Sequence, residues 1–163
     1  MRTTVILATP LGPLAITGSE AGLSVVTFLD KAVAALTLLA AVPVCLRPAH
    51  EQLRAYFGRE LQAFNLICAS VSGTDFQRQV WQALASINYG RTASYFDIAQ
   101  RLNNPKSVRA VGAANGQNPL AIVWPCHRIV GADGSLTGYA GGMHRKKWLL
   151  ELEQPTRQGG LFG

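Results

Sequence analysis

The sequence contains few charged residues and no long apolar run. Only 15% of its 163 residues are Asp, Glu, Lys or Arg, while 48% are hydrophobic, a balance that supports a packed core and argues against intrinsic disorder. A membrane-spanning helix needs roughly 18 consecutive apolar residues, and the longest candidate, residues 32–45, is shorter. The composition therefore predicts one domain, or two small ones, with no membrane partner.

Cysteine is also scarce, with three residues at Cys45, Cys68 and Cys126. An odd number without the spacing of a disulfide framework favours a reducing, intracellular compartment. The first residues, Met1-Arg2-Thr3, lead into a strand-like alternation and lack the features of a signal peptide. We therefore expect a cytoplasmic protein, associated with the nucleoid if the source is bacterial or archaeal.

Positive charge is concentrated in the C-terminal half. The formal net charge is +6, and residues 75–163 hold ten Lys or Arg against five Asp or Glu, whereas residues 1–74 hold five against four. A basic half suits a polyanionic partner such as nucleic acid. Charge alone leaves open a basic protein with no such partner.

The first half of the chain predicts a small sheet followed by helices. Apolar alternation indicates strands over 4–8, 13–18 and 23–29. Turns are expected at Gly12-Pro13 and at 20–22, and helices over 32–41 and 48–57, the second ending at Gly58. The stretch 61–73 is ambiguous, and Ser72-Gly73 is a plausible hinge. We therefore expect two domains, residues 1–73 and 74–163.

The second half predicts a pair of helices joined by a tight break. Thr74 and Ser94 each begin a capping box, Asn103-Asn104-Pro105 interrupts the second helix, and residues 106–117 form a third. Most such pairs are plain packing units, but this one exposes Lys106, Ser107 and Arg109 and carries small residues that allow close approach to a surface. The pattern therefore favours a DNA-binding helix-turn-helix.

Cys126 is followed directly by His127 and Arg128. Cysteine acts as a nucleophile only as the thiolate, which a histidine or a cationic neighbour favours. A cysteine taken alone is more often a small buried hydrophobe. Its polar neighbours instead indicate a reactive thiol.

Together these segments resemble the O6-alkylguanine-DNA alkyltransferases, also called methylated-DNA–protein-cysteine methyltransferases. The likeness covers residues 74–153 strongly and extends weakly to residues 9–14. Several ordered motifs at matching separations are more specific than one short pattern. They are Ser94-Tyr95, Asn104-Pro105-Lys106, Arg109-Ala110-Val111-Gly112, Asn118-Pro119, Pro125-Cys126-His127-Arg128, Gly138-Tyr139, Gly141-Gly142 and Lys147-Trp148-Leu149-Leu150 through Glu153.

The resemblance implies an α/β protein with an N-terminal ribonuclease H-like antiparallel sheet domain and a C-terminal winged helix-turn-helix domain. Its function would be the irreversible, single-turnover transfer of an alkyl group from O6-alkylguanine in duplex DNA, with O4-alkylthymine a further candidate, after the base is flipped out. It implies no cofactor, because the alkyl group arrives on the substrate. We also expect a monomer without an obligate protein partner.

The same resemblance implies a role for each site residue. Cys126 would accept the alkyl group, His127 would act as base through a water, Glu153 would orient the imidazole, Tyr95 would protonate O6 and help rotate the nucleotide, and Asn118 would fix the turn. Arg109 would fill the gap left by the flipped base. The implied DNA contacts are Arg109, Tyr95, Lys106, Ser107, Ala110 and Arg128, and the implied pocket residues are Trp124, Pro125, Ile129, Tyr139, Ala140 and Gly141.

Some features depart from the family pattern. Trp124 stands where an aliphatic residue is expected, which puts the local packing in doubt, and Ala140 lacks a hydroxyl that some relatives carry. Other relatives hold zinc in the N-terminal part, but only Cys45, His50 and Cys68 are candidates here. Those are too few for a closed four-ligand site, so no metal is predicted.

Two rival functions remain open. One is an alkyltransferase-like module that binds lesions without repairing them, although such relatives replace the active cysteine that is present here as Cys126. The other is a cysteine hydrolase that uses Cys126 and His127. A hydrolase would leave the basic helix pair unexplained.

Overall fold

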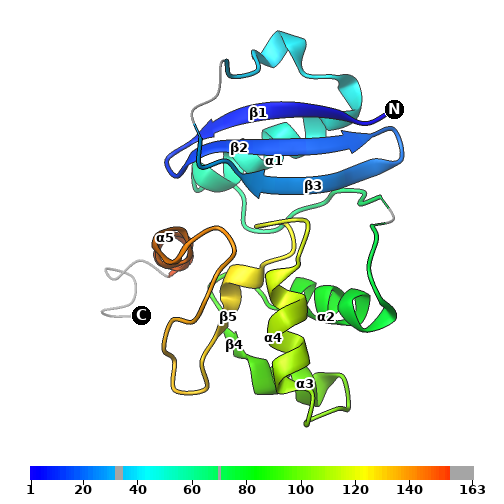
Figure 1. Ribbon diagram of the computed structural model, residues 1–163. Helices are drawn as coiled ribbons and strands as arrows, with labels where there is room; N and C mark the ends of the chain where they lie inside the picture. Colours follow the sequence, from blue (N-terminus) through cyan, green and yellow to red (C-terminus); the bar gives the residue numbers. More distant parts are fainter. Residues whose placement is uncertain (32–34, 70, 155–163) are drawn as a thin grey trace. The chain divides into compact units, whose positions relative to one another are not determined.

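A computed structural model describes residues 1–31, 35–69 and 71–154 of the chain, which contains both helices and a three-stranded antiparallel sheet (Figure 1). The predicted mixed α/β class is therefore confirmed. In the described ranges every helix is too short or insufficiently apolar to span a lipid bilayer.

The chain divides into two compact units. The first comprises Met1–Gly73 together with Asn118–Val123, and the second comprises Thr74–Gln117 together with the chain from Trp124 onward. The helix pair and Cys126 belong to the second unit. The division into residues 1–73 and 74–163, with an N-terminal support domain and a C-terminal domain that binds DNA and accepts the alkyl group, stays a prediction.

The first unit is built on an antiparallel sheet in the order β1-β2-β3. Alternate residues such as Val5, Ile16 and Val26 are buried, as a half-covered sheet requires. The helix α1 lies over one face of the sheet (Figure 1) and buries Leu53 and Tyr56. The predicted strands and second helix are confirmed within two residues. Their bounds are β1 Thr3–Thr9, β2 Gly12–Ser19, β3 Gly22–Phe28 and α1 Arg47–Phe57.

The first hairpin turn differs from the prediction. It falls at residues 10–11, and Gly12 and Pro13 already belong to β2. The Thr9 hydroxyl oxygen accepts a hydrogen bond from the Leu11 N–H at 3.1 Å and donates one to the Gly12 carbonyl at 2.6 Å. These local bonds close the turn two residues earlier than the Gly-Pro pair suggests.

The helix predicted over residues 32–41 is wrong where the structure describes it. Residues 32–34 lie outside the described part, residues 35–38 are not helical, and Leu39–Ala41 forms only a 3-10 turn, η1. The Thr37 N–H donates to the Ile6 carbonyl at 3.0 Å, and the Thr37 hydroxyl accepts from the Ile6 N–H at 2.9 Å. Pairing with the sheet edge overrides the local helix preference of an Ala/Leu-rich segment.

Two segments distant in sequence pair with β3. The Leu23 N–H donates to the Ile67 carbonyl at 2.9 Å, and the Val26 N–H donates to the Pro119 carbonyl at 2.9 Å. The ambiguous stretch 61–73 therefore contributes a bridge through Cys68, and Leu120 contributes a second one. The chain thus returns to the first unit immediately before the Trp124–Arg128 segment.

The second unit is mainly helical. Both predicted capping boxes are present, since the Thr74 hydroxyl accepts from the Gln77 N–H at 3.1 Å and the Ser94 hydroxyl accepts from the Asp97 N–H at 3.0 Å. The expected helix pair α3 and α4 packs with α2, although α4 begins two residues later than predicted. The bounds are α2 Asp75–Ala85, α3 Tyr95–Arg101, α4 Val108–Gly116, η3 Cys126–Arg128 and α5 Met143–Glu153.

A two-residue parallel ladder aligns the helix pair with the cysteine segment. β4 (Ala93–Ser94) pairs with β5 (Ile129–Val130), with Ala93 opposite Ile129. Because β4 leads directly into α3 and β5 directly follows η3, the ladder fixes the start of α3 beside the end of the Cys126–Arg128 turn.

Candidate active site

Cys126 begins the short turn η3 and is only 5% exposed. Its N–H donates to the Trp124 carbonyl at 2.7 Å. The Asn115 side-chain amide on α4 donates to the Cys126 carbonyl at 3.4 Å. The backbone N–H and the carbonyl of Cys126 are therefore both hydrogen-bonded, and the bond to the carbonyl comes from α4.

His127, Arg128 and Glu153 form a buried cluster. The His127 Nε2 atom lies 2.7 Å from Glu153 Oε2, and Arg128 donates from Nε to Oε1 at 2.8 Å and from Nη2 to Oε2 at 3.0 Å. Burial alone would raise the pKa of Glu153, but the bonds from His127 and Arg128 lower it to about 2. Glu153 is therefore a carboxylate at neutral pH and an acceptor only, so His127 Nε2 carries a proton.

The other ring nitrogen of His127 is available as a base. Its Nδ1 atom is buried and has no hydrogen-bond partner among the described residues. Burial lowers the pKa of His127, and the hydrogen bond and charge of Glu153 offset that shift in part. A neutral imidazole with a free Nδ1 lone pair can accept a proton, and Glu153 stabilises the imidazolium that results.

Arg128 is committed to the interior. Besides its bonds to Glu153, its Nη1 donates to the Ile87 carbonyl at 2.5 Å, and its guanidinium carbon lies 5.8 Å from the centre of the Tyr89 ring. The resemblance placed Arg128 among the DNA contacts. In the structure its donors instead hold the carboxylate that supports His127.

Tyr95, the first residue of α3, joins a second polar group. Its hydroxyl lies 2.5 Å from the Thr137 hydroxyl, which also accepts from Lys146 Nζ at 3.3 Å. Lys146 is fully buried; burial lowers its pKa and the negative charge that Cys126 can carry raises it. Gly112 on α4 faces the Tyr95 ring, since a Cβ there would lie 3.6 Å from it.

Tyr139 stands at the start of the glycine-rich turn. The Gly142 N–H donates to the Tyr139 carbonyl at 2.9 Å, and Arg145 donates to the Gly141 carbonyl at 3.0 Å, while Ala140 is exposed. The Tyr139 hydroxyl oxygen is buried. Burial raises its pKa well above the ordinary value, and the charge of a Cys126 thiolate and a side-chain hydrogen bond with Cys126 raise it further. Tyr139 therefore faces the sulfur.

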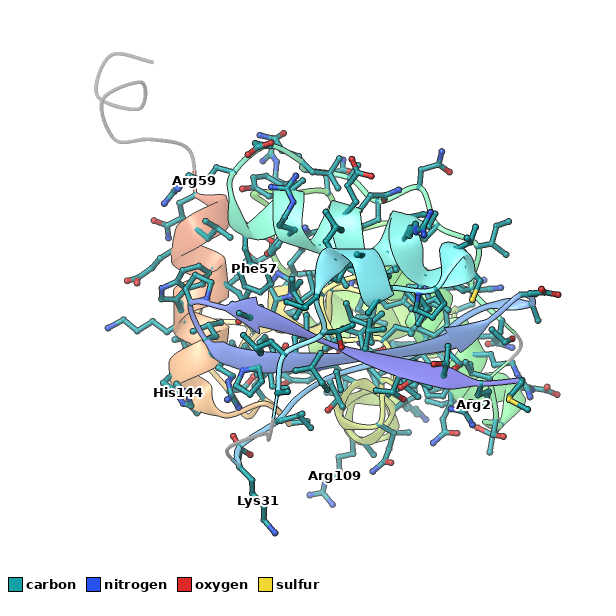
Figure 2. The ribbon with its side chains drawn as sticks, turned by 90° about the horizontal axis from the view of Figure 1, so that it is seen from above. Arg2, Lys31, Phe57, Arg59, Arg109 and His144 are labelled. Atoms are coloured by element: carbon teal, nitrogen blue, oxygen red, sulfur yellow. The ribbon has the colours of Figure 1, made fainter. Side chains whose placement is uncertain are left out.

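The exposed face expected to contact DNA lies on and before α4. Lys106, Arg109 and Ala110 are exposed, and Ser107 is half-buried. Figure 2 shows the Arg109 side chain extending away from its helix. Asn118 lies in the first unit, where its side-chain oxygen accepts from the Leu120 N–H at 3.0 Å.

Trp124 packs against another tryptophan. Its ring is stacked on Trp81 at 5.9 Å with an interplanar angle of 20°, and the Trp81 indole N–H donates to the Ala114 carbonyl at 2.9 Å. An aromatic residue at position 124 is thus accommodated by its own stacking partner. The neighbouring Pro125 and Ile129 are buried.

One cavity of the second unit, of about 450 Å³, lies next to the buried cluster. Glu153 and Val130 line it together with exposed residues that include Arg91 and Lys147, but Cys126 and Tyr139 do not. It is therefore distinct from the expected alkyl pocket. The described residues contain no group of three His, Cys, Asp or Glu side chains placed to hold a metal ion.

The sequence analysis assigned no role to Thr137 or to Lys146. A signal for Lys146 was available, because Lys146, Leu149 and Glu153 follow the i, i+3, i+7 spacing of one helix face and all three are buried. No comparable pattern marks Thr137, which lies in the irregular segment between β5 and α5.

Comparison with known proteins gives consistent matches. The family described as "6-O-methylguanine DNA methyltransferase, DNA binding domain" matches residues 75–155. A methylated-DNA–protein-cysteine methyltransferase of Methanosarcina acetivorans is 45% identical over 150 residues, which cover 91% of this chain and 96% of that protein. The crystal structure of Mycobacterium tuberculosis O6-methylguanine methyltransferase matches over 100% of both chains with a TM-score of 0.82 and 40% identity. That of Mycobacterium tuberculosis OGT in complex with DNA matches over 92% of each chain with a TM-score of 0.81 and 44% identity.

Proposed function

The chain belongs to the methylated-DNA–protein-cysteine methyltransferase family, and we propose that it removes alkyl groups from O6-alkylguanine in duplex DNA by transferring them to Cys126. One observation carries the assignment to these residues. The buried Cys126 is followed by a histidine whose Nε2 is hydrogen-bonded to an ionised Glu153 and whose Nδ1 has no hydrogen-bond partner among the described residues. This arrangement suits a base beside a nucleophilic thiol.

The first chemical step is deprotonation of the thiol. His127 Nδ1 takes the Cys126 proton through a water, and the Glu153 carboxylate stabilises the imidazolium. The buried ammonium of Lys146 favours the thiolate by its charge.

The second step is a single displacement at the alkyl carbon. A sulfur lone pair forms the S–C bond while the bond from carbon to guanine O6 breaks and its electrons return to the base. The Tyr95 hydroxyl gives its proton to the departing guanine, which leaves as a neutral base, and the tyrosine regains a proton afterwards. The product is a thioether on Cys126 without an easy leaving group, so each molecule acts once.

DNA binding is assigned to the helix pair. We infer that the second unit acts as a winged helix-turn-helix, with Lys106 near the phosphates and Arg109 filling the gap left by the flipped base, a step that costs a few kcal/mol. Arg128, in contrast, supports Glu153 in this proposal and does not contact DNA. The first unit would be a ribonuclease H-like support domain, and the protein would act as a monomer without cofactor or protein partner.

Mass spectrometry of the intact protein tests this function. After mixing with duplex DNA that contains O6-methylguanine, the protein should gain one methyl group, located on Cys126. The matched control, Cys126→Ser, should gain none yet bind the same DNA, because the phosphate contacts lie elsewhere. Tight binding without any gain by the wild-type protein would favour a lesion-binding module, and repeated turnover would favour a hydrolase.

A further inference from the structure

Three side chains from separate segments meet at the Thr137 hydroxyl. Tyr95 comes from the start of α3, Lys146 from α5, and Thr137 from the segment between β5 and α5. The Tyr95 and Thr137 oxygens are 2.5 Å apart, and Lys146 Nζ lies 3.3 Å from the same Thr137 oxygen and 3.3 Å from the Gly138 carbonyl. The proton donor of the proposed reaction is therefore bonded to a residue with no role so far.

The chemistry of the three groups limits the directions of these bonds. An ammonium can only donate, so Thr137 accepts from Lys146; its hydroxyl keeps one proton and a second lone pair. That proton can point to the Tyr95 oxygen, or Tyr95 can donate to Thr137. The positive charge of Lys146 polarises the Thr137 hydroxyl and makes it the better donor, so the bond from Thr137 to Tyr95 is favoured.

The environment of Lys146 strengthens this preference. The ammonium is fully buried, and among the described residues no carboxylate lies within ion-pairing distance of it. Its charge is therefore not neutralised by a carboxylate and acts on the two oxygens it contacts.

We infer that Thr137 is a positioning residue for the transfer reaction: it accepts a hydrogen bond from Lys146 and donates one to Tyr95, so that the Tyr95 proton is directed to the departing guanine. If Tyr95 instead donated to Thr137, its proton would be engaged and would have to be released before the C–O6 bond breaks. This inference rests on the proposed function, since it concerns the acid of that reaction.

Two variants separate the hydroxyl from the shape of the side chain. Thr137→Val keeps the volume and removes the hydroxyl, whereas Thr137→Ser keeps the hydroxyl. With saturating protein and duplex DNA that contains O6-methylguanine, Thr137→Val should slow the single-turnover transfer roughly tenfold, in line with the loss of one hydrogen bond. Thr137→Ser should restore the wild-type rate, and the DNA affinity should be the same in all three proteins.

A second reaction of the same sulfur tests whether the effect passes through Tyr95. Iodoacetamide alkylates Cys126 with iodide as the leaving group, which needs no proton, so Thr137→Val should react with it at the wild-type rate. In a Tyr95→Phe background, Thr137→Val should cause no further loss of transfer, because the proton it positions is already absent.

These outcomes distinguish the inference from the proposed function. A wild-type rate of transfer in Thr137→Val, an equal slowing with iodoacetamide, or additive losses with Tyr95→Phe would overturn the role of Thr137 and leave the proposed function intact. Wild-type protein that gains no methyl group from the DNA would instead overturn the proposed function, and the inference with it.

Discussion

Replacing Glu153 by Gln gives the sharpest test of the buried cluster. Glu153 is 2% exposed, and its contacts lower its pKa from 4.5 to about 2. At about 1.4 kcal/mol per pKa unit, the ionised side chain contributes about 3 kcal/mol to the free energy of unfolding at neutral pH. The variant should lose about that amount, because His127 and Arg128 stay buried while their shared charge partner is removed.

The sign of the pH dependence follows from the lowered pKa. A carboxylate whose pKa is lower in the folded state stabilises the protein above the unfolded value, and the stabilisation fades as the pH falls from about 4.5 toward 2. Urea unfolding of both proteins should therefore show a difference of about 3 kcal/mol at pH 7 that shrinks below pH 4.5. A loss of equal size at every pH would mean that packing, and not the carboxylate charge, causes it.

The same variant reports on catalysis if it stays folded. Without the negative charge, the imidazolium of His127 is less stable, so proton transfer from Cys126 is less favourable. The pH–rate curve for single-turnover transfer should therefore move to higher pH, with DNA affinity unchanged. A folded variant with the wild-type curve would show that Glu153 does not support His127 in the reaction.

Three further predictions concern the helix pair. Arg109→Ala should slow repair in duplex DNA far more than reaction with free O6-benzylguanine, which needs no flipping; an equal loss on both substrates would assign Arg109 to the pocket or the fold. The affinity of the wild-type protein for DNA should fall as the salt concentration rises, because phosphate contacts release counterions. Ser94→Ala should destabilise the second unit by about 1 kcal/mol, measured by thermal unfolding, because it removes the N-cap of the helix that carries Tyr95; an unchanged midpoint would mean that the tertiary contacts alone hold the start of α3.

Local signals in the sequence predicted the elements that depend on local chemistry. The capping boxes at Thr74 and Ser94 are local hydrogen-bond patterns, and the helices that they begin are confirmed. The segment 35–41 has a local preference for helix, yet its backbone bonds to the edge of β1. The ladder between β4 and β5 has only two residues in each strand, too few for an alternation to be recognised.

The site residues also differ in whether the sequence alone identifies them. Cys126 and His127 are adjacent in the sequence, so the pair can be recognised from the sequence alone. Glu153 ends a helix, where the helix dipole disfavours a carboxylate, and this position indicates that another group stabilises its charge. The roles of Thr137 and Lys146 depend on the folded structure, because neither residue belongs to a recognisable motif. They lie together with Tyr95 only after three separate segments have come together.

In the proposed reaction, the buried clusters around Glu153 and Lys146 would separate two proton movements. Glu153 carries its negative charge on the side of His127, where a proton must arrive, and Arg128 keeps that carboxylate ionised. Lys146 carries its positive charge toward Thr137 and Tyr95, from which a proton would depart in the proposed reaction, and toward Cys126, where negative charge would develop. A single charged residue could not favour both movements, because the charge that attracts a proton at His127 would retain one at Tyr95. We therefore infer that the separation of Glu153 from Lys146 on one face of α5, about two turns apart, allows the same interior to hold the proposed base and the proposed acid.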